Sequence, residues 1–92
     1  MVDLVELERT AFEAQNSNRF QDAVITWETI LEINPGWEFG YAYYNLADCY
    51  LRVGKIDEGE SAYRKAVEIA PDNEMFTDAL HSLLEDRKSG YI

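Results

Sequence analysis

Apolar side chains recur at three- and four-residue spacing in five stretches of this 92-residue chain. In the first stretch, Leu4, Leu7, Ala11 and Ala14 would lie on one face of a helix. The same spacing predicts five helices, at residues 2–15, 20–33, 39–52, 57–70 and 74–88. The pattern therefore predicts an all-α fold with negligible strand.

Turn-forming residues separate the predicted helices. Residues 16–18 (Asn-Ser-Asn) follow the first helix and residues 34–36 (Asn-Pro-Gly) follow the second. Proline disfavours helix in the residue before it, and glycine supplies free dihedral angles. Gly54 is the expected stop of the third helix. Asp57 and Glu60, three residues apart, are typical of a capping pair at the start of the fourth.

Two stretches of the chain repeat each other at an offset of 36 residues. Residues 27–35 read Trp-Glu-Thr-Ile-Leu-Glu-Ile-Asn-Pro, and residues 63–71 read Tyr-Arg-Lys-Ala-Val-Glu-Ile-Ala-Pro. The correspondence continues upstream, where the small residue Ala23 matches Gly59. A repeat of this length is typical of a solenoid unit, which cannot bury its own apolar face and must stack on a neighbour. We expect the stacked repeats to form a binding surface rather than a catalytic pocket.

The second copy resembles the tetratricopeptide repeat, whose pattern is Trp-x-x-Leu-Gly-x-x-Tyr, then Ala-x-x-x-Phe, then Pro. Its matching positions are Tyr43, Leu46, Ala47, Tyr50, Gly59, Tyr63 and Pro71. The first copy matches more loosely, through Leu7, Thr10, Ala11, Ala14, Ala23, Trp27 and Pro35. The resemblance implies a helical-hairpin solenoid of two antiparallel helix pairs and a cap. One domain at 1–92 would hold repeat one at 4–37, repeat two at 40–73, a capping helix at 74–88 and a tail at 89–92.

The junction between the copies departs from the family pattern. The family period is about 34 residues, so Glu38 and Phe39 are the expected extra residues, which either lengthen the turn or add to the next helix. Gly59 costs about 1 kcal/mol inside a helix relative to Ala, which indicates a close helix crossing. The predicted cap carries its apolar residues Phe76, Leu80, Leu83 and Leu84 on one stripe.

The chain is strongly acidic, with 8 Lys and Arg against 18 Asp and Glu and a net charge of −10. This charge disfavours nucleic acid and anionic membranes as partners. It serves solubility or attracts basic partners. The single Cys49 fits a reducing compartment, and neither a secretory signal nor a membrane-length apolar run is present. A cytoplasmic location is expected, with no metal and no cofactor.

The resemblance implies that the first helix of each pair lines a concave groove that binds a peptide. Carried onto this chain, the groove residues are Val5, Glu8, Arg9, Phe12, Gln15, Asn16, Tyr41, Tyr44, Asn45, Asp48, Leu51, Arg52, Met75, Asp78, Ala79 and Ser82. Because this set mixes apolar with acidic side chains, it suits an apolar segment with one or two basic residues.

One use of the family is argued against by the same positions. Family members that grip acidic chaperone tails use a clamp of Lys, Asn and Arg side chains. Only Asn45 matches that clamp here, while Glu8 has the wrong charge for a carboxylate ligand and Met75 and Ala79 carry none. Asn45 also has a structural interpretation, because Asn is common at this point of the repeat.

The aromatic run at residues 37–44 has two interpretations. Strict alternation would make it a strand, whereas the repeat makes most of it the start of the third helix. In the second interpretation Tyr43 is core, Trp37 and Phe39 staple the junction, and Tyr41 and Tyr44 face outward as binding residues.

The sequence favours a non-catalytic protein-binding adaptor over an enzyme. A nucleophile and base would have to come from Cys49 and His81, which the repeat places as a buried thiol and a packing imidazole. The alternative function is self-association, which would cover Leu4, Leu7 and Trp27 at the edge of the first copy. The apolar tail Tyr91 and Ile92 either docks in the groove or frays.

Overall fold

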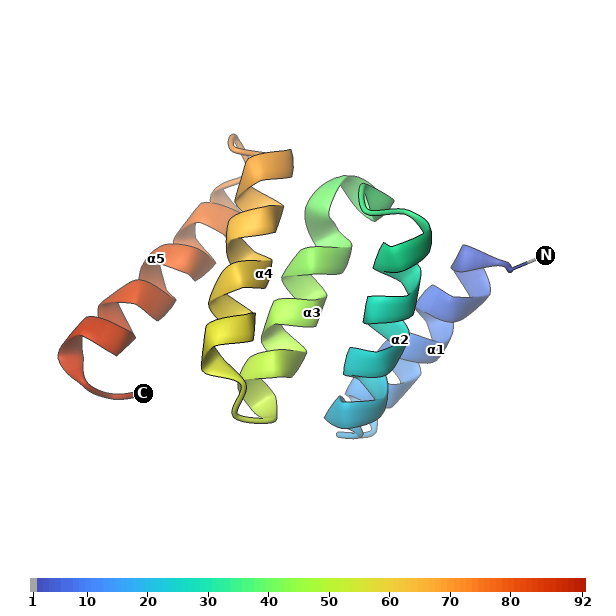
Figure 1. The fold of residues 1–92 in the computed structure, drawn as a ribbon, viewed down its shortest axis with the longest axis horizontal. Helices are drawn as coiled ribbons and strands as arrows, with labels where there is room; N and C mark the ends of the chain where they lie inside the picture. The colour runs from blue at the N-terminus through green and yellow to red at the C-terminus, as the bar shows by residue number, and fades with distance from the viewer. Residues whose placement is uncertain (1) are drawn as a thin grey trace.

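The computed structural model describes residues 2–92, which form five α-helices and one 3₁₀ helix and contain no strand. The helices are α1 (Leu4–Asn16), α2 (Phe20–Ile33), η1 (Trp37–Gly40), α3 (Tyr41–Arg52), α4 (Ile56–Ile69) and α5 (Glu74–Ser89). Each helix packs on the next in chain order, from α1 at one end of the molecule to α5 at the other (Figure 1). Two antiparallel pairs and a cap extend over 45 × 28 × 18 Å. The all-α prediction is confirmed.

Side-chain caps fix the starts of α1 and α5. The Asp3 carboxylate accepts a hydrogen bond from the backbone N–H of Val5 at 3.0 Å, so α1 begins at Leu4, two residues later than predicted. The Asn73 side chain accepts from the backbone N–H of Met75 at 2.9 Å and caps α5 in the same way.

The predicted capping pair of α4 is wrong. The helix begins at Ile56 after Lys55, and no side chain caps it. Asp57 and Glu60 instead accept hydrogen bonds from the Arg87 guanidinium, at 2.6 and 2.9 Å. The two carboxylates thus tie α5 to α4 rather than closing their own helix, because a cation on the next helix offers charge-assisted bonds.

The two extra residues of the junction lengthen the turn and do not extend α3. Glu38 and Phe39 both adopt left-handed backbone conformations, with φ of 55° and 53°, inside η1. A side chain in this conformation costs roughly 1–2 kcal/mol per residue. The α3 helix therefore begins at Tyr41, two residues later than predicted. Phe39 is 81% exposed, so its predicted role as a buried staple is wrong.

The first core lies between α1, α2 and α3. Trp27 is 1% exposed at its centre, with Val24 and Ile30 beside it. The indole N–H of Trp27 donates to the Gln15 side chain at 2.6 Å, and Phe12 packs on the ring edge to face, with centroids 5.2 Å apart. The expectation that Trp27 lies exposed at the edge of the first copy is wrong, because α1 covers it.

The second core joins α3, α4 and α5 through small residues. A Cβ added at Gly59 would lie 2.7 Å from Cδ2 of Leu51 and 3.4 Å from the Ala47 carbonyl oxygen. The predicted close crossing is confirmed, since only glycine leaves this space to Leu51. Phe76 is 0% exposed and Leu83 4%, so the predicted apolar stripe of α5 covers the end of the second helix pair.

Candidate interaction surface

The predicted groove residues lie on three helices, α1, α3 and α5, and together define what we call the α1–α3–α5 face. On α1, Val5 is 62% exposed and Phe12 39% exposed, and the ring of Phe12 rests on Trp27. Gln15 is committed to the Trp27 indole, and Arg9 pairs with Glu6 and, at 3.6 Å, with Glu13 of its own helix. The α1 helix therefore leaves Val5 and Phe12 exposed to solvent and holds Arg9 in ion pairs within its own helix.

Glu8 is the half-buried acid of this face. Partial burial and the nearby charge of Glu38 raise the pKa of its carboxyl above the ordinary value, and the indole N–H of Trp37 offsets part of that rise. The Trp37 nitrogen is itself buried and does not reach hydrogen-bond geometry with any group in residues 2–92. A cation placed beside Glu8 and Glu38 would relieve the repulsion between the two carboxylates.

An aromatic platform links α3 to α5. Tyr44 stacks on Phe76 with ring centroids 5.4 Å apart and an interplanar angle of 28°. Tyr41 meets Phe76 edge to face at 4.9 Å, and Tyr44 lies 5.8 Å from Tyr63. Tyr41 is 40% exposed, while Phe76 is buried. The platform is a rigid apolar surface with an exposed edge, as interfaces often present.

The polar side chains of α3 are mostly engaged within the chain. The Asn45 amide donates to the Tyr41 carbonyl oxygen at 2.9 Å, which supports the structural interpretation of this Asn. Arg52 lies 3.7 Å from Asp48, and its guanidinium sits 5.2 Å from the ring centroid of Phe20. Arg52 thus faces α2, so the structure does not bring it together with the tyrosines.

The α5 helix adds an exposed apolar and an exposed acidic side chain. Met75 is 47% exposed, and Asp78 is exposed and forms no ion pair within the described part of the chain. Toward the other end of α5, Leu51, Ala79 and Ser82 line a cavity of about 350 Å³. These residues give the face a free negative charge beside apolar contacts.

The tail lies at the same cavity. Gly90 ends α5 with φ of +82°, and the backbone N–H of Tyr91 donates to the Asp86 carbonyl oxygen at 3.0 Å. Ile92 then lines the cavity together with Leu51 and Ala79, although it remains 53% exposed. Tyr91 is 82% exposed and does not line the cavity.

Two contact residues of this region escape sequence reasoning. Phe39 was expected to staple the junction between the copies, yet its side chain is exposed to solvent on a left-handed backbone two residues before Tyr41. Asn73 lies 3.5 Å from the Tyr41 hydroxyl through its side-chain nitrogen and fixes that ring from the neighbouring loop. The left-handed conformation of Phe39 has no local sequence signal, because such a conformation is usually marked by a glycine. The contact between Asn73 and Tyr41 has none either, because 32 residues separate the two in the chain.

The residues considered for catalysis do not converge. Cys49 is 0% exposed, and burial raises the pKa of its thiol to about 12, so the thiolate nucleophile is disfavoured. His81 is exposed on α5, which corrects its predicted packing role. No group of three His, Cys, Asp or Glu side chains within residues 2–92 is arranged to hold a metal ion.

Comparison with known proteins settles the family. A family model described as tetratricopeptide repeat matches residues 40–73. Heat shock protein STI1 of Saccharomyces cerevisiae is 36% identical over 62 residues, which cover 67% of this chain and 10% of that protein. The chain belongs to the tetratricopeptide repeat family. The family is in general a non-catalytic protein-interaction fold, and protein partners follow from it.

The matched segment is short relative to the yeast protein, so the chain spans about a tenth of the length of that relative. No helix within residues 2–92 has the length and apolar character to cross a membrane.

Proposed function

We propose that this chain is a non-catalytic adaptor whose α1–α3–α5 face binds a short partner segment, apolar and carrying one or two Lys or Arg residues. The observation that carries the proposal is the platform of Tyr41, Tyr44 and Phe76, next to exposed Met75 and unpaired Asp78. Apolar contacts would supply the binding free energy, and the acidic side chains would set the polarity of the ligand.

We also propose that the chain is divided into two repeats, a cap and a tail. Helices α1 and α2 act as repeat one at 4–37, α3 and α4 as repeat two at 40–73, α5 as the cap at 74–88, and 89–92 as the tail. The adaptor is acidic and cytoplasmic, works without a cofactor or a metal, and does not bind nucleic acid or membranes. The repeat family and the net charge of −10 support these assignments.

Display selection of 12-residue peptides against the intact chain tests the function. We expect enrichment of sequences with Leu, Ile or Phe near a Lys or Arg, and an affinity that falls as salt rises, since exposed charges are screened over about 10 Å at 0.1 M. Asp78→Lys should weaken the best selected peptide about tenfold. Asp72→Lys, which makes the same charge change in the α4–α5 loop, is the matched control and should leave the affinity within about twofold.

Two outcomes would contradict the proposal. One is enrichment of acidic peptides, because the polarity assigned to the face would then be reversed. The other is an equal effect of Asp72→Lys and Asp78→Lys, which would reduce the acidic preference to net charge alone.

Self-association is the second candidate function, favoured by the exposure of Phe39 and by Ile92 at the cavity beside Leu51. A second copy could place its own Tyr91 and Ile92 there. Measuring the mass in solution by light scattering at rising concentration decides between the two. A dimer lost on Phe39→Ser or Ile92→Ser supports self-association, whereas a monomer throughout excludes it.

A further inference from the structure

A second surface lies on the side of the molecule formed by α2 and α4, with α3 as its floor. Three adjoining cavities of about 280, 390 and 220 Å³ all include Tyr43. Leu46 and Tyr50 continue the floor along α3. We call this surface the α2–α4 groove. It uses none of the residues of the α1–α3–α5 face, so it goes beyond the function proposed above.

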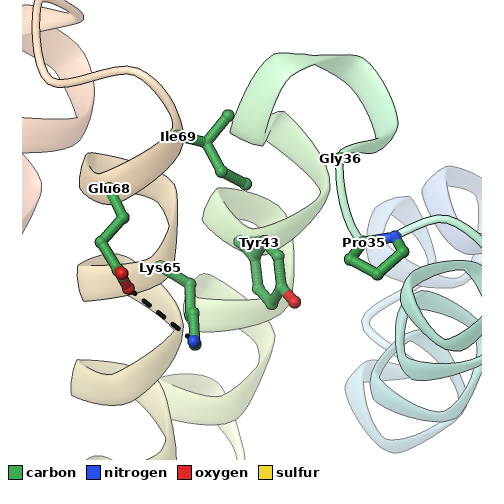
Figure 2. Close-up of a pocket in the computed structure, with 6 residues that line it drawn as sticks. All are labelled: Pro35, Gly36, Tyr43, Lys65, Glu68 and Ile69. Atoms are coloured by element: carbon green, nitrogen blue, oxygen red, sulfur yellow. Dashed lines mark ion pairs between the residues drawn. The ribbon is translucent and has the colours of Figure 1, made fainter.

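One end of the α2–α4 groove is apolar. Figure 2 shows the Tyr43 ring between Pro35 on the α2–α3 connection and the side chains of Lys65 and Ile69 on α4. Ile69 is 40% exposed here. Pro35, Tyr43 and Ile69 therefore surround a space that suits one aliphatic or aromatic side chain.

Acidic side chains border the groove on both sides. Glu28 and Glu32 border it from α2, and Glu58 and Glu68 from α4. Its one base, Lys65, lies 3.8 Å from Glu68 and is neutralised by that carboxylate.

Glu28 and Glu32 stand one turn apart on α2 and face the same cavity. Neither forms an ion pair within residues 2–92. Like charges at this spacing destabilise a helix. Glu28 is also held in place, because the Tyr50 hydroxyl donates to its carboxylate at 2.5 Å. A cation in this cavity would therefore meet two carboxylates, one of them already oriented.

The length of the groove fits a short extended peptide. Tyr43 and Tyr50 are seven residues apart on α3, which at 1.5 Å per residue is about 10 Å. An extended chain rises about 3.3 Å per residue, so about three residues span that distance. Side chains two residues apart lie on the same side of an extended chain.

We propose that the α2–α4 groove binds an extended segment of a partner protein in which an arginine and an apolar residue are separated by one residue. The guanidinium faces Glu28 and Glu32, and the apolar side chain enters the space between Pro35, Tyr43 and Ile69. Arginine suits the site better than lysine, because its planar fork can bond two carboxylates and can stack on an aromatic ring such as Tyr43.

A titration of the isotope-labelled chain with the blocked pentapeptide Gly-Arg-Gly-Leu-Gly tests the proposal by NMR. We expect the largest shifts at amides of residues 28–34, 36, 43–50 and 65–69. Glu32→Lys should weaken the pentapeptide about tenfold, equivalent to one charge-assisted hydrogen bond. Glu85→Lys makes the same charge change on the exposed side of α5, outside both surfaces, and should leave the affinity within about twofold.

Changes in the peptide separate charge from apolar contact. Citrulline in place of arginine keeps the shape of the side chain and removes its charge, so it should weaken binding about as much as Glu32→Lys. Glycine in place of leucine should abolish the shifts near Pro35 and Ile69 while leaving those near Glu28. Ile69→Ser, an exposed change at the end of α4, should reproduce the leucine-to-glycine result.

Three results would overturn the proposal. Shifts confined to α1 and α5 would place the peptide on the other face. Equal affinities for Glu32→Lys and Glu85→Lys would reduce the effect to net charge. Shifts at the groove that follow the chain concentration without peptide would identify a second copy as the occupant. Because the readout lies on α2 and α4, none of these results depends on the fate of the function proposed above.

Discussion

At the scale of single residues, Gly59 is a position where helix packing leaves no room for a side chain. The absent side chain makes room for Leu51 of α3, and an added Cβ would lie 2.7 Å from its Cδ2. We expect Gly59→Val to destabilise the fold by about 1–3 kcal/mol through overpacking. Gly59→Ala should cost less, since alanine regains about 1 kcal/mol of helix propensity. Urea unfolding followed by circular dichroism checks both, and a Gly59→Val variant as stable as the parent would contradict the close crossing.

Glu38 shows the opposite case, a side chain in a backbone conformation that favours glycine. Because its φ is 55°, Glu38→Gly should relieve strain and stabilise the chain by roughly 1 kcal/mol. Glu85→Gly, on the exposed face of α5, is the matched control and should destabilise the chain by about 1 kcal/mol. If both variants lose stability in urea unfolding, the left-handed turn is not strained.

At the scale of elements, the cavity between α3, α4 and α5 decides the role of the tail. Ile92 lines it while 53% exposed, so Ile92→Ser should lower stability by less than about 1 kcal/mol. If the tail competes with a ligand, the same variant should bind the peptide selected on the α1–α3–α5 face about two- to fivefold more tightly. Tyr91→Ser, which changes a side chain outside the cavity, is the control. Unchanged affinity for Ile92→Ser, measured by fluorescence anisotropy, would show a tail without influence on the face.

Sequence reasoning located the elements well because their signals are local or repeated. Apolar residues at three- and four-residue spacing mark the helices, and Pro35 and Gly54 mark the turns, so each signal lies within a few neighbouring residues. The 36-residue offset identified Gly59 as a crossing point. These features act on neighbours in the chain or on the matching position of the second copy, so they are readable without coordinates.

The contacts that sequence reasoning missed depend on the rotation and approach of whole helices. Arg87 donates a hydrogen bond to Asp57, which lies 30 residues away in the chain. The side of α5 on which His81 lies is set by the rotation of α5 about its axis when it packs on α4. The left-handed position of the turn is occupied by Phe39 rather than by glycine, so the sequence does not indicate its conformation. The α2–α4 groove also had no signal, since Glu28, Tyr43 and Ile69 come together only when three helices are in place.

At the scale of the whole molecule, buried ionisable groups predict a loss of stability in alkali. Burial, with a smaller contribution from the charge of Asp48, raises the pKa of Cys49 and of Tyr63 to about 12 each. In the unfolded chain these groups have pKa values of about 8.5 and 10. Above about pH 8 the unfolded state therefore begins to release protons that the folded state keeps. Stability is fully present below that pH and falls as pH rises toward 12.

We expect the urea midpoint to fall between pH 8 and 10.5, with Cys49 contributing up to about 2 kcal/mol of the loss. In Cys49→Ala the urea midpoint should fall less steeply with pH, whatever the absolute stability of that variant. A midpoint that stays constant or rises over this range would contradict the buried, neutral thiol.

The net charge of the whole molecule affects binding at both of its surfaces. A net charge of −10 on a body 45 Å long attracts basic segments from every side, so attraction alone does not locate a binding site. The platform of Tyr41, Tyr44 and Phe76 and the α2–α4 groove differ in shape, and each is expected to select its own ligand by apolar contact together with its own local carboxylates rather than by net charge.

The most direct test of the central claim is NMR mapping of the peptide selected on the intact chain. We expect the largest amide shifts on α1, α3 and α5, around Phe12, Tyr41, Asp48, Met75 and Asp78. We expect little change along the outer turns of α2. Shifts spread evenly over the acidic surface, or a selected peptide that perturbs only α2 and α4, would contradict the α1–α3–α5 face as the adaptor's primary binding site.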